Sequence, residues 1–99
     1  VLIRVEAAGV NFRDTMKALG IYPVSSDLDL ILGDECAGTI LAVGEGVHDL
    51  SPGDAVMAVT PGCFAAEVTA PALCVVRRPE RLTPAQAATM PVAFLTALY

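Results

Sequence analysis

Short runs of branched and small apolar residues alternate along the chain with glycine- and proline-rich segments. This pattern is typical of β-strands joined by tight turns. The runs predict five strands, over residues 1–8, 35–43, 55–59, 63–70 and 72–77. Gly38, inside the second run, indicates a bulge or a close approach of two backbones. Several short strands at close intervals favour a small, irregular β-barrel, so we expect a mainly β fold with short helices.

One short helix is predicted directly after the first strand, over residues 11–20. Asn11 suits the N-cap position, and Asp14 places a negative charge in the first turn. Three apolar side chains recur with an i, i+4, i+7 spacing: Phe12, Met16 and Leu19. We therefore expect an apolar helix face, with the charged side chains pointing elsewhere. A helix of about two turns is too short to be stable alone in water, so neighbouring segments must hold it.

The pattern changes from strand to helix after Pro79. A capping box with proline at the first helical position marks the start of a helix: Thr83, Pro84 and Gln86. A second helical segment begins at Pro91 and runs to the end of the sequence. We expect residues 1–80 to form the barrel and residues 81–99 to form helices that lead into another structural unit. The apolar ends of the sequence favour a piece cut from a longer polypeptide.

The composition is unusually apolar for a chain of 99 residues. Hydrophobic residues make up 55% of it, and the mean hydropathy is +0.62, whereas roughly 45–50% including glycine is usual. Because a domain of this size exposes much of its surface, the excess indicates an oligomer or a surface that another part covers.

Charge and hydropathy exclude two classes of partner. The net charge is −5, with six basic residues that are mostly scattered, so nucleic acid is not an expected partner. No segment reaches the roughly 20 unbroken apolar residues of a membrane-spanning helix, so we expect no membrane partner.

The three cysteines are odd in number and far apart: Cys36, Cys63 and Cys74. Neither a disulfide framework nor a structural zinc site is expected from this spacing. Buried, unreactive thiols in a reducing compartment are favoured, which predicts a cytoplasmic protein.

Direct signals of catalysis are few. The adjacent carboxylates Asp34 and Glu35 begin a strand, where successive side chains face opposite ways, so they do not form an acid–base pair. Their expected role is to accept hydrogen bonds from a neighbouring backbone. Taken alone, Asn11 is an ordinary helix cap, and Tyr22 is either a packing aromatic or a proton donor.

Five short motifs follow one another at residues 8–14, 19–23, 33–38, 43–47 and 52–56, and the tail motifs at residues 86–91 and 95–97 fit the same series. This order resembles the medium-chain dehydrogenase/reductase superfamily. The Asn-Phe-Arg-Asp run is most similar to the enoyl reductase domains of modular polyketide synthases and animal fatty acid synthase. The resemblance implies a GroES-like, partly open β-barrel followed by a Rossmann domain that binds NADPH, with the active cleft between them.

The resemblance also bears on metal binding. Zinc-dependent members of the superfamily carry a cysteine near the start of the first helix and a histidine before the glutamate of the third motif. Here the corresponding stretches are residues 10–14 and 33–35, and both ligands are absent. Without thiolate and imidazole there is no basis for a catalytic zinc, so no metal site is expected. This favours reduction of an activated double bond over alcohol oxidation.

For that reaction, the resemblance implies hydride transfer from NADPH to the β-carbon of an α,β-unsaturated thioester on an acyl carrier protein, followed by protonation of the enolate at the α-carbon. Asn11 and Phe12 would line the nicotinamide end, and Asp14 would lie nearby and fix the helix. Thr96 would contact the cofactor at the domain junction. Tyr22 matches a candidate α-carbon proton donor, since a phenol with a pKa of about 10 is protonated at pH 7.

The expected partners are therefore the carrier-bound enoyl thioester, the Rossmann domain and the other synthase domains of the same polypeptide. One alternative is a free-standing NADPH:quinone oxidoreductase with the same fold and cofactor. Another is a non-catalytic GroES-like binding module in which Asn11 and Tyr22 are structural. The apolar tail at residues 91–99 favours a chain that packs against a further domain over such a module.

Overall fold

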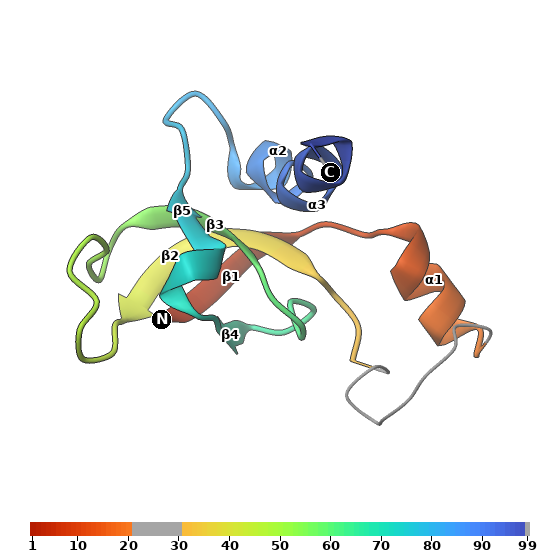
Figure 1. The fold of residues 1–99 in the computed structure, drawn as a ribbon, viewed down its shortest axis with the longest axis horizontal. Helices are drawn as coiled ribbons and strands as arrows, with labels where there is room; N and C mark the ends of the chain where they lie inside the picture. The colour runs from red at the N-terminus through yellow and green to blue at the C-terminus, as the bar shows by residue number, and fades with distance from the viewer. Residues whose placement is uncertain (21–30, 99) are drawn as a thin grey trace.

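The computed structural model describes residues 1–20 and 31–98. Five antiparallel strands form one open sheet in the order β4-β1-β2-β3-β5 (Figure 1). The strands are β1 (Leu2–Ala8), β2 (Glu35–Ala42), β3 (Ala55–Val59), β4 (Glu67–Thr69) and β5 (Val75–Arg77). The helices are α1 (Phe12–Ala18), α2 (Pro84–Ala88) and α3 (Pro91–Leu98). The expectation of a mainly β fold with short helices is confirmed.

The first three strands lie where the sequence pattern predicts them, but the two edge strands are shorter than predicted. Residues 64–66 bend before β4, and Cys63 N–H donates to the carbonyl of Gly33 at 3.3 Å. Before β5 the chain forms a 3₁₀ turn, η2 (Ala72–Cys74), in which Cys74 N–H donates to Pro71 O at 2.9 Å. The predicted strands over residues 63–70 and 72–77 were therefore too long. Before β5 a local turn hydrogen bond replaces the sheet ladder, whereas before β4 the chain bends and Cys63 bonds to Gly33, which is distant in sequence.

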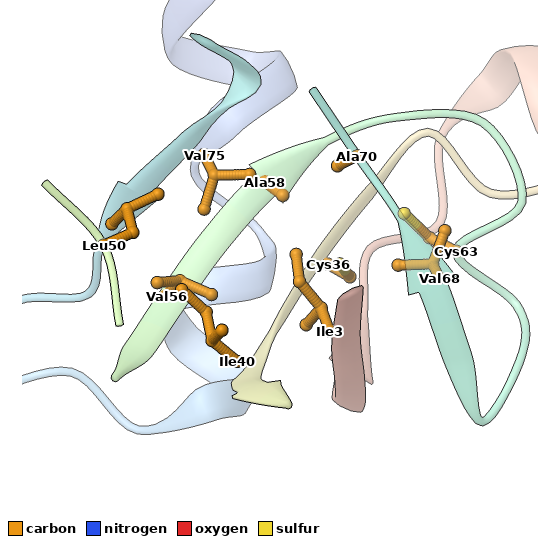
Figure 2. Close-up of a cluster of buried hydrophobic side chains, with 10 residues drawn as sticks. All are labelled: Ile3, Cys36, Ile40, Leu50, Val56, Ala58, Cys63, Val68, Ala70 and Val75. Carbon is orange, nitrogen blue, oxygen red and sulfur yellow. The ribbon is translucent and has the colours of Figure 1, made fainter. Parts of the chain in front are cut away.

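The central strands pack on both faces of the sheet. One face carries a cluster of ten buried side chains (Figure 2): Ile3, Cys36, Ile40, Leu50, Val56, Ala58, Cys63, Val68, Ala70 and Val75. On the other face Ala37 packs against Ala87 and Ala88 of α2. Cys36 and Ala37 belong to different clusters because successive strand residues face opposite ways. Helices α2 and α3 lie together on one side of the sheet, whereas α1 lies at the far end of the molecule (Figure 1).

β1 and β2 approach each other closely at Gly38, as the sequence predicts. A methyl group built there would penetrate the carbonyl oxygen of Arg4 and would lie 3.0 Å from Cγ2 of Ile3. The register of the two strands shifts beside this point, between Val5 and Ala7. Glycine is required here because any side chain would separate the strands.

The C-terminal helices begin as predicted. Thr83 Oγ1 accepts from Gln86 N–H at 3.2 Å, and Gln86 Oε1 accepts from Thr83 N–H at 3.0 Å, which completes the capping box of α2. The division between residues 1–80 and 81–99 stays a prediction. Among the described helices, none is long and apolar enough to cross a membrane.

The predicted orientation of the helix after β1 is wrong. Phe12 of α1 is 75% exposed, while Asp14 and Lys17 are buried. The charged side chains face inward because they hydrogen-bond to the backbone that precedes β2. Asp14 Oδ1 accepts from Gly33 N–H at 2.9 Å, and Lys17 Nζ donates to Ile31 O at 3.0 Å. Charge-assisted hydrogen bonds, rather than the packing of an apolar face, therefore hold α1 against the rest of the molecule.

The cysteines differ from one another in exposure. Cys36 and Cys63 are buried as expected, whereas Cys74 is exposed, so the prediction of buried thiols was wrong for Cys74. Cys63 Sγ donates to Thr60 O at 3.1 Å. A hydrogen bond with Cys36, together with burial, raises the pKa of the Cys63 thiol. This thiol therefore stays protonated and unreactive at neutral pH.

Candidate functional site

A pocket of about 400 Å³ brings together Asn11 and Thr96, which come from opposite ends of the chain. The lining is completed by residues from the first turn of α1, the segment before β2, the end of β3 with the turn after it, and α3: Arg13, Asp34, Val59, Thr60, Pro61, Val92 and Leu95. Apolar side chains of α3 thus face polar groups from the start of α1 and β2. Such a mixture is typical of a small-molecule site.

Asn11 occupies the N-cap of α1, as predicted. Its backbone is extended, with φ −118° and ψ 160°, and its carbonyl accepts from Asp14 N–H at 2.9 Å. Its own N–H donates to Asp14 Oδ2 at 3.0 Å. The side chain has another partner, because Nδ2 donates to Glu35 Oε1 at 3.2 Å. The amide of Asn11 is thereby held at the edge of the pocket.

Asp14 lies behind this edge. Its side chain is 3% exposed, and its two oxygens accept from the N–H groups of Asn11 and Gly33. These bonds join the first turn of α1 to the segment before β2. Asp14 is not among the residues that line the pocket. Its contacts correspond to the helix-fixing role that the sequence suggests.

The other predicted site residues are distributed unevenly. Thr96 lies on the exposed side of α3 and lines the pocket. Phe12 is exposed and is not among the lining residues. Tyr22 lies outside the described residues. The structure therefore groups Asn11 and Thr96 in one pocket and places Phe12 outside its lining.

Asp34 and Glu35 point in different directions, as their positions in the sequence predict. Asp34 lines the pocket and pairs with Arg13, whose Nε lies 3.9 Å from Asp34 Oδ2. The Arg13 side chain is 46% exposed, so this ion pair contributes less than about 1 kcal/mol to stability. Glu35 is buried and accepts a backbone hydrogen bond from Val92 N–H at 2.6 Å, which confirms the expected type of contact.

Sequence reasoning did not identify Arg13 and Glu35 as parts of the site. Arg13 lies within the Asn-Phe-Arg-Asp motif, so its position next to Asn11 and Asp14 was the available signal. For Glu35 the only signal was a carboxylate at the start of a buried strand. Its link to Val92 joins residues far apart in the chain, and no local pattern indicates such a pair.

An apolar groove of about 410 Å³ adjoins the pocket, and Val59 and Leu95 line both. The groove lies between the β3–β5 edge of the sheet and α3, and several of its large apolar side chains are exposed: Leu73, Val76, Phe94 and Leu98. Contiguous exposed apolar surface of this kind marks an interaction site. This groove accounts for part of the excess of apolar residues.

Residues 1–91 match the family model of the alcohol dehydrogenase GroES-like domain. The chain belongs to this family. The resemblance seen in the sequence motifs is therefore confirmed, and the open sheet is that of a GroES-like domain.

Known relatives of this GroES-like domain include polyketide synthases and reductases. It is 48% identical over 99 residues to the pikromycin polyketide synthase component PikAII of Streptomyces venezuelae. Among solved structures, the CurK enoyl reductase is 38% identical with a TM-score of 0.90 over 100% of the chain. The mycobacterial protein Rv1454c, solved in complex with NADPH, is 38% identical with a TM-score of 0.84 over 100% of the chain.

The GroES-like domain spans only part of each of these proteins. It covers 2% of PikAII, 32% of the CurK enoyl reductase chain and 31% of the Rv1454c chain. The chain is homologous to enoyl reductases and to a segment of polyketide synthases, which are multidomain proteins. It is thus related to oxidoreductases of the medium-chain dehydrogenase/reductase superfamily.

Proposed function

We propose that this chain forms the GroES-like half of the active cleft in a zinc-free, NADPH-dependent enoyl reductase domain of a polyketide synthase. The substrate is an α,β-unsaturated acyl thioester on an acyl carrier protein. The observation that carries the proposal is that Asn11 and Thr96, predicted separately as cofactor contacts, line one pocket. The similarity to the CurK enoyl reductase and to an NADPH-bound protein supports the same interpretation.

The residues of the pocket fit the nicotinamide end of NADPH. The amide oxygen of Asn11 can accept a hydrogen bond, and the hydroxyl of Thr96 can both donate and accept, as a carboxamide requires. Val92 and Leu95 provide an apolar wall suited to a ring. A pocket of about 400 Å³ admits the ring and part of the ribose, and a further domain would hold the rest of the dinucleotide. When bound, NADPH supplies the hydride for the β-carbon of the thioester.

The donor set of the pocket does not fit a catalytic zinc. Among the described residues that line it, Asp34 is the one common zinc ligand, and zinc sites need three or four ligands that usually include histidine or cysteine. In this proposal, hydrogen-bond donors of the protein polarise the thioester.

The side chains of α1 divide into two roles in this proposal. Asn11 contacts the nicotinamide, and Thr96 contacts it from α3. Asp14 holds the first turn of α1 in place through its two backbone hydrogen bonds. Phe12, exposed beside the pocket, provides apolar surface for the cofactor or for the domain that carries it. Tyr22 donates the proton to the α-carbon.

The substrate class is tested on the complete reductase domain that contains this chain. We expect NADPH oxidation with an enoyl thioester of pantetheine to exceed that with a benzoquinone by about tenfold or more in kcat/KM. A chelator should leave the rate unchanged. Faster reaction with the quinone would favour the free-standing quinone oxidoreductase. Absence of NADPH oxidation with either acceptor would favour a non-catalytic module.

Tyr22→Phe in the complete domain is expected to impair protonation more than hydride transfer. Loss of a general acid typically costs about 10²–10⁴ in the step it serves. With an α-methyl enoyl thioester, the variant should lose control of the product configuration, while single-turnover NADPH oxidation stays near the wild-type rate. Chiral analysis of the product and stopped-flow measurement provide the two readouts. An unchanged configuration would remove Tyr22 from the mechanism.

A further inference from the structure

Glu35 is a buried carboxylate that connects two sides of the pocket. It is the first residue of β2 and is 2% exposed. One oxygen, Oε1, accepts from Asn11 Nδ2 at 3.2 Å, and the other, Oε2, accepts from Val92 N–H at 2.6 Å. Both partners line the pocket, but Glu35 itself does not. It can therefore act on a bound molecule only through them.

We propose that Glu35 is a positioning residue for the nicotinamide. It sets which atom of the Asn11 amide faces the cofactor, and it fixes the first turn of the helix that carries Thr96. This inference rests on the proposed function, since it assigns the pocket to NADPH.

The orientation of the Asn11 amide follows from the chemistry of its partner. A carboxylate only accepts hydrogen bonds, whereas an amide has a donating and an accepting end. Asn11 must therefore turn its NH₂ group towards Glu35, as the Nδ2–Oε1 contact shows. This leaves Oδ1 as the atom that can accept from a ligand. A nicotinamide carboxamide offers the N–H that such an acceptor needs.

The second bond anchors α3. Val92 N–H lies in the first turn of this helix, where N–H groups have no partner within the helix. A carboxylate at this end is also favoured by the helix dipole. Most side chains of α3 are exposed, so packing in the described chain restrains the helix only weakly. Thr96 lies one turn beyond Val92, and its position follows from that anchor.

A substitution at Gly9 provides a second way to displace the Glu35 carboxylate. A methyl group at Gly9 would overlap Glu35 Oε1 and would lie 2.7 Å from the carbonyl of Ala88. Gly9→Ala should therefore push Glu35 away from Asn11 without changing either side chain, although it also presses on the backbone of α2 at Ala88. Gly44 is a matched control, because a methyl group there would meet nothing within 4 Å.

Glu35→Gln tests the orientation directly. Val92 N–H can only donate, so the amide introduced by this substitution must direct its oxygen to that group and its NH₂ to Asn11. Asn11 then has to reverse its own amide to accept, and it presents a donor to the cofactor. Both hydrogen bonds of this side chain survive, so the variant should fold.

The decisive measurement is a double-mutant cycle on NADPH affinity in the complete reductase domain. We expect Glu35→Gln and Asn11→Ala each to raise the Kd for NADPH by about tenfold, as for the loss of one hydrogen bond. The double variant should show about the same loss as either single one. Losses that multiply would show that Glu35 does not act through Asn11 and would overturn the proposal.

The cycle separates this inference from the proposed function. Gly9→Ala should raise the Kd for NADPH at least as much as Glu35→Gln does, because it displaces the whole carboxylate, and Gly44→Ala should bind NADPH as the wild type does. If the double variant loses no more NADPH affinity than either single variant, but the domain does not reduce enoyl thioesters, the role of Glu35 is supported and the proposed substrate is refuted. If the domain reduces the thioester but the losses of NADPH affinity multiply in the double variant, the proposed substrate is supported and the role of Glu35 is refuted. Absence of NADPH binding to the wild type would refute both.

Discussion

Gly38→Ala is expected to destabilise the fold by about 3 kcal/mol, the upper end of the usual range for overpacking, because the site cannot relax. The added methyl group would overlap the carbonyl oxygen of Arg4 and press on Ile3. Arg4 cannot retreat, because β1 is paired on both sides and Arg4 lies opposite Thr39 of β2 and Glu67 of β4. Ile3 is fully buried in the main core, so it cannot move aside either. Urea denaturation of the wild type and the variant measures the difference.

Gly44→Ala provides the control for this prediction. It makes the same chemical change at a glycine with open space around the added methyl group. A small gain in stability of up to about 1 kcal/mol is expected, because alanine restricts the unfolded chain. Equal denaturation midpoints for the two variants would contradict the close approach at Gly38.

The 99-residue chain alone is expected to bind NADPH at least about a hundredfold more weakly than the complete reductase domain does. Its pocket offers contacts for the nicotinamide end only, and the rest of the dinucleotide would stay in water. The adjoining groove, with Phe94 and Leu98 exposed, also lacks any cover in the described chain. Fluorescence titration of NADPH with the chain and with the complete domain gives the two dissociation constants.

The two dissociation constants can be compared only if the chain is folded, so a cooperative unfolding transition of residues 1–99 must accompany the titration. A folded chain with a submicromolar Kd would show that the binding site is complete without another domain. It would contradict the division of the cleft between two domains.

Much of the fold follows from local sequence. The strands over residues 35–43 and 55–59 and the capping box of α2 were predicted correctly. Each depends on signals within a few residues: runs of branched side chains, glycine turns, and the Thr83–Gln86 spacing. The predicted strand over residues 72–77 was too long because η2 after Pro71 depends on a single turn hydrogen bond. Hydrophobic pattern does not distinguish such a turn from a strand.

The orientation of α1 could not be predicted from its own sequence. An i, i+4, i+7 stripe of apolar residues indicates which face would be buried if packing alone decided the matter. In the structure, Asp14 and Lys17 decide it by bonding to the backbone of residues 31–33. That backbone belongs to another segment, so only the tertiary structure brings donor and acceptor together.

For the site, the motifs of the sequence supplied Asn11 and Thr96, and the structure adds that they line the same pocket. Glu35 required the structure, because its two partners lie on either side of it in sequence, before β2 and beyond β5. A residue whose two hydrogen-bond partners are both distant in the chain leaves no pattern in the sequence around it. The link that Glu35 makes between Asn11 and Val92 therefore became visible only in the structure.

The position of β1 in the sheet also sets the order of assembly during synthesis. β1 is the first strand of the described chain, but it lies between β2 and β4, and Val1 N donates to Ala70 O at 2.9 Å. Its two neighbours come from residues 35–42 and 67–69. As the ribosome releases the chain, β1 must wait until both segments have emerged before its edges are paired. Long sequence separation of this kind slows folding and prolongs the exposure of an apolar strand.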